Sequence, residues 1–236
     1  MSRAILELAS PAEPLPHALL PDDDPIPAPA RATVNHILRT NHGKRVAIIE
    51  NEFGEVGVDD GLVVETKEEI FEMNNGCICC TVRGDLIRIL SKLFRMKAKL
   101  DGIVIETTGL ADPGPVAQTF FMDDEIAEEF SLDGIVTLVD AAHIEQQLGR
   151  SDESTEQVAF ADILVLNKTD LVSDEALDNV ESRLREMNRM ARVVRTERGN
   201  VSVDTVLNLG AFDLDSALEK RPTFLFFQFT DDKTKK

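Results

Sequence analysis

The three cysteines of the chain, Cys77, Cys79 and Cys80, all fall within the short segment NNGCICC. Thiolates this close together can converge on one soft metal ion, and zinc accepts such ligands in a tetrahedron that a carboxylate or water completes. The preceding Gly76 gives the backbone freedom to turn around an ion. We therefore interpret this thiol cluster as a candidate metal site.

Two other interpretations of the thiol cluster stay open. Buried cysteines often pack as small apolar side chains, and neighbouring thiols can oxidise. Three cysteines within four positions favour packing less than a single cysteine would, and a disulfide between residues this near in sequence is strained. Metal binding is the favoured hypothesis. An odd number of crowded cysteines also fits a reducing compartment better than a disulfide framework.

A second group of polar residues follows the apolar run LVL, where Asn167, Lys168 and Asp170 form the pattern N-K-x-D. An aspartate in this position accepts from the ring N–H and the amino group of guanine, which adenine does not offer. The methylene stem of the lysine can lie along the base plane, and the asparagine can brace the loop. The alternative is a polar surface loop with an exposed lysine and aspartate.

A third group follows the run GIVI, with Glu106 at the end of the run and Gly109 shortly after it. A carboxylate there can hold Mg²⁺ through water, and a glycine amide can reach a terminal phosphate. The alternative is a surface glutamate before a glycine turn.

The phosphate-binding motif G-x-x-x-x-G-K-[ST] that should accompany these groups does not occur in the sequence. The segment before NHILRTNHGKRVAIIE is PIPAPARATV, which has three prolines without a backbone N–H and no glycine. Losing three or four charged hydrogen bonds costs about 5 kcal/mol or more, which lowers affinity by roughly a thousandfold. We expect guanine nucleotide to bind weakly or not at all.

Elements that could position these groups alternate along the chain. Apolar, β-branched runs at 45–50, 102–106, 134–140 and 162–167 are typical of parallel strands buried on both faces, and helical patterns occupy 83–99 and 173–190. This order predicts an α/β fold with a doubly wound, mostly parallel sheet and helices on both faces, as in P-loop NTPases. Ligands bind such sheets at the carboxyl ends of the strands, where the polar groups fall.

Charge and hydropathy exclude several functions. The chain has 236 residues, of which 43% are hydrophobic, and a net charge of -18. This charge repels nucleic acid and anionic membrane surfaces. No apolar run reaches the roughly 20 residues that span a bilayer, and the amino terminus does not resemble a signal peptide. We expect a cytoplasmic protein; the nucleus and an organelle stroma stay open as alternatives.

Composition divides the chain into three parts. Seven of the ten prolines lie between Pro11 and Pro29, beside an acidic run, so residues 1–31 are predicted to be a disordered acidic leader. Residues 32–216 form the predicted nucleotide-binding domain. Residues 217–236 are predicted to be the remnant of a truncated carboxyl-terminal domain, because their tail RPTFLFFQFTDDKTKK starts like a strand.

Four segments together resemble the CobW family of P-loop GTPases, namely IENEFGEVGVDDGLV, NNGCICC, IETTGLADPGPV and LVLNKTD. This family includes the zinc-regulated GTPase metalloprotein activators and is related more distantly to the UreG and HypB nickel chaperones. The resemblance runs from about Thr33 to about Asp215. It implies a C-x-C-C metal site at the thiol cluster, with Glu50 or Glu55 as the fourth ligand. It also implies Mg²⁺ near Glu106 and guanine at the N-K-x-D residues.

The resemblance implies a zinc metallochaperone that uses GTP with Mg²⁺ and transfers Zn²⁺ to a client metalloprotein, with residues 50–64 as the switch between the two sites. In the family pattern, Thr33 and Val34 would continue into the phosphate-binding loop, but here they run straight into Asn35. This arrangement indicates an internal deletion that truncates the first strand. Whether the chain is a GTPase therefore stays open, and the alternative is a non-enzymatic zinc-binding or adapter module.

Overall fold

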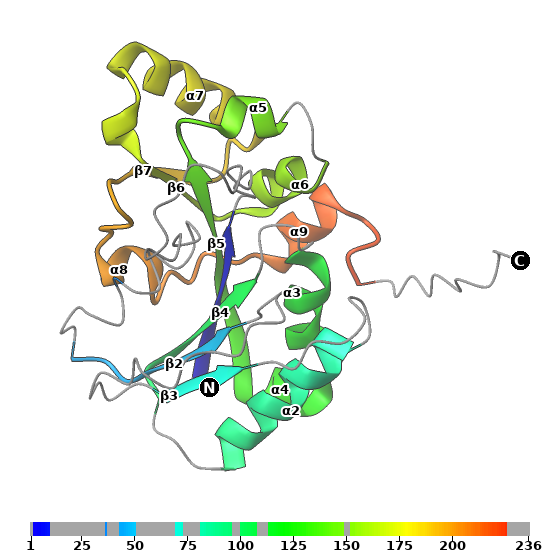
Figure 1. Ribbon diagram of the computed structural model, residues 1–236. Helices are drawn as coiled ribbons and strands as arrows, with labels where there is room; N and C mark the ends of the chain where they lie inside the picture. Colours follow the sequence, from blue (N-terminus) through cyan, green and yellow to red (C-terminus); the bar gives the residue numbers. More distant parts are fainter. Residues whose placement is uncertain are drawn as a thin grey trace, which may run out of the picture.

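The computed structural model describes residues 2–9, 36, 43–50, 69–72, 81–95, 100–107, 113–148 and 152–225. In these residues the chain forms a seven-stranded parallel sheet with the order β3-β2-β4-β1-β5-β6-β7 (Figure 1). The strands are β1 (Ser2–Ala9), β2 (Val46–Glu50), β3 (Glu69–Glu72), β4 (Gly102–Thr107), β5 (Phe130–Asp140), β6 (Ile163–Asn167) and β7 (Arg192–Arg195).

Helices cover both faces of this sheet, as predicted. Figure 1 shows α2, α3 and α4 on one side of the sheet and α8 on the other. Alternate residues of each strand supply the two cores, so that Ile49 faces α2 while Ile48 lies in the cluster that contains α8. The helices are α2 (Thr81–Arg95), α3 (Pro113–Met122), α4 (Asp124–Glu129), α5 (Ile144–Leu148), α6 (Asp152–Phe160), α7 (Asp174–Met187), α8 (Val203–Val206) and α9 (Leu214–Lys220).

The four predicted apolar runs correspond to β2, β4, β5 and β6, and the two predicted helices correspond to α2 and α7. The side chain of Ser173 accepts a hydrogen bond from the backbone N–H of Ala176, which caps α7 at its amino end. Leu177, Val180 and Leu184 of this helix are buried, as their spacing predicts. The predicted doubly wound α/β fold is therefore confirmed.

The central strand differs from the prediction. Residues 2–9, which were assigned to a disordered leader, form β1 between β4 and β5, where Glu7 aligns with Glu106 and Leu6 aligns with Ile135. An empty place there would leave unpaired backbone groups on both neighbouring strands, which is costly inside a core. The short apolar run AILELA is long enough to fill it. The central strand is thus present, and the remaining leader residues, 10–31, lie outside the described residues.

The carboxyl-terminal boundary also differs from the prediction. A boundary between residues 216 and 217 would fall inside α9, and the predicted strand that follows begins as a turn at residues 222–225. Phe224 is 0% exposed, and its ring centre lies 6.0 Å from that of Phe160 and 6.4 Å from those of Phe121 and Phe212. The core of this α/β domain therefore extends through this turn. Residues 226–236 lie outside the described residues.

Two aspartates near the amino ends of β5 and β6 accept hydrogen bonds from backbone N–H groups of other segments. The carboxylate of Asp133 accepts hydrogen bonds from the backbone N–H groups of Leu209 (2.7 Å) and Gly210 (2.8 Å). The carboxylate of Asp162 accepts one from Ile135 (2.8 Å). Burial raises the pKa of Asp162 to about 6, assisted by the nearby negative charge of Asp133 and opposed by the Ile135 hydrogen bond.

The central position of β1 predicts a strong effect of proline. Because β1 has a neighbour on each side, every backbone N–H in its middle has a strand partner, and Leu6→Pro removes one of them. We expect the free energy of unfolding in urea to fall by about 2 kcal/mol or more. Leu6→Val keeps the N–H and serves as the control. Equal unfolding midpoints for the two variants would contradict the placement of β1.

The raised pKa of Asp162 predicts a pH-dependent stability. Between its unfolded value of 3.8 and about 6, the folded state holds a proton that the unfolded state releases. The stabilisation from this carboxyl is complete below about pH 4 and is lost as the pH rises through about 6, with a total of up to about 3 kcal/mol. Asp162→Asn does not titrate, so its stability relative to the parent chain should rise across that window in urea titrations. If the free energies of unfolding of the two chains change with pH in parallel, the pKa of Asp162 is not raised in the folded state.

Candidate functional site

Those predicted site residues that the structure describes, Glu50, Glu106 and the N-K-x-D residues, lie at or just after the carboxyl ends of the parallel strands. The strand register aligns Asp140 of β5 with Asn167 of β6, and Glu50 of β2 with Glu106 of β4. The Mg²⁺ residue predicted in β4 and a predicted zinc ligand in β2 are therefore backbone neighbours. Neighbouring strands lie about 4.8 Å apart, so a nucleotide site and a metal site at these ends would share one edge of the sheet.

Several predicted site residues lie outside the described residues, namely Cys77, Cys79, Cys80, Glu55 and Gly109. Among the described side chains, no group of three or more histidine, cysteine, aspartate or glutamate residues is arranged to hold a metal ion. The metal-site assignment therefore stays a prediction from the sequence.

Asn167 links the end of β6 to the loop that follows β7. Its side chain is buried, with 3% of the residue exposed, and its Oδ1 accepts a hydrogen bond of 3.0 Å from the backbone N–H of Gly199. Its backbone carbonyl accepts another from Ala141, which follows β5. Asn167 thus joins the connections after three neighbouring strands.

The backbone conformation of the loop after β7 brings the N–H of Gly199 to the side chain of Asn167. Arg198 and Gly199 both adopt positive φ angles, of 52° and 68°, a region that favours glycine. The hydroxyl of Thr196 donates to the backbone carbonyl of Asn200 (2.9 Å), and the hydroxyl of Thr169 donates to the backbone carbonyl of Thr196 (3.1 Å). The loops after β6 and β7 therefore form one hydrogen-bonded unit.

Lys168 is held in place by a buried carboxylate. Its backbone is left-handed, with φ of 61° and ψ of 34°, and its Nζ donates to Oδ2 of Asp140 at 2.8 Å. The ring Nδ1 of His143 lies 3.0 Å from the same oxygen, and the backbone N–H of Ala142 donates to Oδ1 at 3.0 Å. Burial opposes ionisation of Asp140, but the hydrogen bonds from Lys168 and His143 outweigh it and lower the pKa of this carboxyl.

Asp170 has a different environment from Asn167 and Lys168. It lies in the one-turn helix η2 (Thr169–Leu171) and is exposed. The turn is closed by a backbone hydrogen bond of 3.0 Å from Leu171 to the carbonyl of Lys168. Within the described residues the carboxylate of Asp170 has no hydrogen bond to another protein group, so its oxygens can accept from a bound base. Such an arrangement can recognise a guanine edge.

Comparison with known proteins decides the family. The sequence model of the CobW/HypB/UreG nucleotide-binding domain matches residues 32–195. The chain belongs to the CobW/HypB/UreG family.

Relatives within the CobW/HypB/UreG family carry zinc-related names. The chain is 42% identical over 184 residues to the zinc-regulated GTPase metalloprotein activator 1 of Schizosaccharomyces pombe, covering 75% of this chain and 45% of that protein. It is 38% identical over 198 residues to the zinc chaperone YjiA of Escherichia coli, covering 82% of this chain and 62% of that protein. The chain thus spans between 45% and 62% of the length of these two relatives.

The fold agrees with a solved member of the family. The crystal structure of the Zn(II)-bound YjiA GTPase of Escherichia coli superposes with a TM-score of 0.68 at 29% identity, covering 90% of this chain and 63% of that one. The family match begins at residue 32, so β1 lies outside it. The central strand of this CobW/HypB/UreG domain is therefore supplied by residues that precede the matched region.

Two features of the CobW/HypB/UreG site were missed in the sequence. Asp140 ends the run GIVTLVD, so an acidic residue at the carboxyl end of a predicted strand could have marked it. Gly199 follows β7, which is a short strand with a mixed exposure pattern. Its residues show no strand pattern in the sequence, and the contact of Gly199 with Asn167 forms only in the folded chain.

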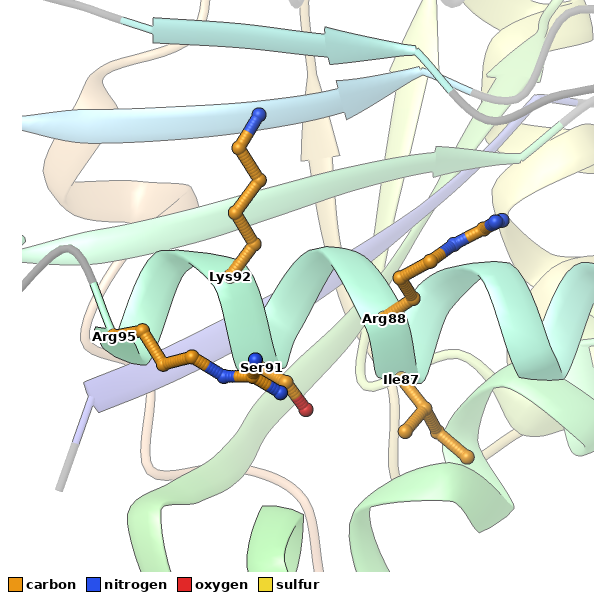
Figure 2. Close-up of a pocket in the computed structure, with 5 residues that line it drawn as sticks. All are labelled: Ile87, Arg88, Ser91, Lys92 and Arg95. Carbon is orange, nitrogen blue, oxygen red and sulfur yellow. The ribbon is translucent and has the colours of Figure 1, made fainter.

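A separate hollow of about 500 Å³ runs along α2, away from the strand ends, and is lined by Ile87, Arg88, Ser91, Lys92 and Arg95 (Figure 2). Its described lining comes from one helix, and Figure 2 shows Lys92 and Ile87 pointing away from each other. The hollow is basic, but its lining residues lack the convergent acceptors that a guanine base needs.

Among the described residues, none of the helices combines the length and the hydropathy that a membrane span requires.

The link from Asn167 to Gly199 predicts a measurable loss of stability. Asn167→Ala leaves the buried N–H of Gly199 without its acceptor, so we expect the free energy of unfolding to fall by about 1 to 3 kcal/mol. Amide exchange at Gly199 should accelerate in the same variant. Asn200→Ala changes an exposed side chain in the same loop and should shift stability by less than about 0.5 kcal/mol. If the two variants behave alike, the side chain of Asn167 does not hold the loop.

Proposed function

We propose that this chain is the nucleotide-binding part of a CobW-type zinc metallochaperone that transfers Zn²⁺ to a client metalloprotein and has impaired GTP binding. The observation that supports this proposal is the guanine-recognition half of the site. Asn167 is buried and holds Gly199, Lys168 is fixed by Asp140, and Asp170 is exposed at the end of β6. This arrangement suits the edge and face of a guanine base.

The chain has fewer residues suited to binding the phosphates of GTP than to binding its base. Phosphates are bound by backbone N–H groups of a glycine-rich loop and by its lysine. The sequence that follows β1, SPAEPLPHALLPDDDPIPAPARATV, has neither the glycines nor the lysine. Glu106 is half-buried at the end of β4, where it would hold Mg²⁺ through water, with Gly109 following it in sequence. Mg·GTP would therefore be held mainly through its base.

The proposed metal cargo binds next to this site. Zn²⁺ would take Cys77, Cys79 and Cys80 as thiolate ligands and a carboxylate of Glu50 or Glu55 as the fourth. The alignment of Glu50 with Glu106 supports a position beside the Mg²⁺ residue. The names of the relatives, a zinc chaperone and a zinc-regulated GTPase metalloprotein activator, agree with this cargo. We place its action in the cytoplasm.

A second candidate function follows from the missing phosphate loop. A chain that cannot hold the phosphates would act as a non-enzymatic zinc-binding or adapter module, binding metal and client without hydrolysis. The metal ligands are the same in the two candidates. They differ in whether nucleotide binds and turns over.

Calorimetric titration of the purified chain with Zn²⁺ and with Mg·GTP tests both candidates. We expect one tight zinc site and GTP affinity lowered by roughly a thousandfold from a micromolar site, into the millimolar range. GTP should still bind more tightly than ATP, because Asp170 accepts from guanine. Equal affinity for the two nucleotides, or no binding of either, would favour the adapter module. Micromolar GTP affinity with turnover would exclude the adapter module and the proposed impairment.

Replacing the three cysteines by serine should abolish tight zinc binding, because a serine hydroxyl does not supply a thiolate. Zinc affinity is measured separately for Glu50→Gln and Glu55→Gln. The variant that loses more affinity identifies the carboxylate ligand. Glu52→Gln, in the same segment, is the matched control and should keep the parent affinity. Unchanged zinc affinity in the triple serine variant would show that the metal site lies elsewhere.

A further inference from the structure

We infer that Asp140 is a positioning residue for Lys168, and that by holding the lysine ammonium it also orients the turn that carries Asp170. This inference rests on the proposed function for the identity of the ligand. The geometry that carries it, a buried carboxylate fixed at both oxygens beneath a lysine of the N-K-x-D loop, does not depend on that ligand.

Asp140 is held in position by other groups of the protein. It is the last residue of β5, aligns with Asn167 of β6 and is 3% exposed. Its Oδ1 accepts from the backbone N–H of Ala142, while its Oδ2 contacts Nζ of Lys168 and Nδ1 of His143. With both oxygens engaged from different directions, the carboxylate has one orientation, and the lysine ammonium is held at one place.

The ion pair with Asp140 stabilises Lys168 in a backbone conformation that is unfavourable for a residue other than glycine. A left-handed conformation is uncommon for a residue other than glycine, and Lys168 adopts it with φ of 61°. A buried carboxylate without a cation is also costly. The ion pair offsets both costs at once. The turn of η2 begins directly after Lys168, with the Leu171 N–H bonded to its carbonyl, so the pair also orients the turn that carries Asp170.

Because the ammonium of Lys168 is bonded to Asp140, the methylene groups are the part of this side chain that can contact a ligand. An ammonium bonded at 2.8 Å to a buried carboxylate has its charge balanced by that carboxylate, which makes it a weaker phosphate contact. The lysine side chain is nevertheless 35% exposed. Its methylenes can pack along an aromatic base while the ammonium remains on Asp140, as long cationic side chains commonly do. Lys168 would thus serve as an apolar platform next to Asp170.

The test compares Asp140→Asn, Lys168→Met and the double variant, with Asp178→Asn as the control. Asp178 of α7 forms an exposed ion pair with Arg195 of β7, so its replacement makes the same chemical change away from the base. Binding of fluorescent GDP and of the inosine analogue IDP, which lacks the 2-amino group, is measured for each. We expect Asp140→Asn to weaken both nucleotides by the same factor, about tenfold. Asp170→Asn should instead reduce the preference for GDP over IDP.

The double variant separates positioning from independent contacts. If Asp140 acts through Lys168, the double variant should bind no more weakly than Asp140→Asn alone, because the two changes remove one interaction. Losses that multiply in the double variant, or parent-like GDP affinity in Asp140→Asn, would overturn the inference.

Amide hydrogen exchange gives a readout that does not require nucleotide. Asp140→Asn and Lys168→Met should each accelerate exchange of the Leu171 N–H by about tenfold while leaving the Gly199 N–H, held by Asn167, unchanged. This pattern in a chain that binds no guanine nucleotide would mean that the proposed function fails and the positioning role stands. No acceleration at Leu171 in Lys168→Met, or equal acceleration at both amides, would overturn the positioning role.

Discussion

The pairing of backbone groups across a parallel sheet is the constraint on which the rest of this structure depends. Each internal strand must have a hydrogen-bonded neighbour along both edges, because its N–H and C=O groups have no access to water. Here β1, formed by residues 2–9, fills the place between β4 and β5. With that place filled, β2 and β3 on one side and β6 and β7 on the other belong to one continuous sheet.

The parallel direction of the strands determines where chemistry can occur. All the carboxyl ends meet at one edge of the sheet, so residues 50, 106, 140 and 167 lie along that edge although they are far apart in sequence. The residues proposed to bind the base lie at the end of β6 and are joined by hydrogen bonds to the loops after β5 and β7. The phosphate-binding part has no corresponding loop in the sequence. The two halves of a nucleotide site are therefore separable in this chain, because different strands carry them.

Acidic residues have different tasks at the two ends of the sheet. At the amino ends, Asp133 and Asp162 accept backbone N–H groups, and burial keeps the pKa of Asp162 high. At the carboxyl end, Asp140 is also buried, but Lys168 and His143 keep it ionised. The sign of each pKa shift follows from whether a cation lies within hydrogen-bonding distance. Part of the large negative charge of the chain thus holds strands and loops together.

The sequence by itself determined the four apolar strands β2, β4, β5 and β6, the two long helices and the N-K-x-D loop, because these depend on local periodicity and on residues adjacent in the chain. Only the tertiary structure decided that residues 2–9 form the central strand, since their composition resembled the start of a proline-rich leader. It also decided that Phe224 belongs to the core and that Asp140 holds Lys168. These contacts join residues distant in sequence, and local pattern carries no information about which distant group will complete a buried hydrogen bond or fill a place in the sheet.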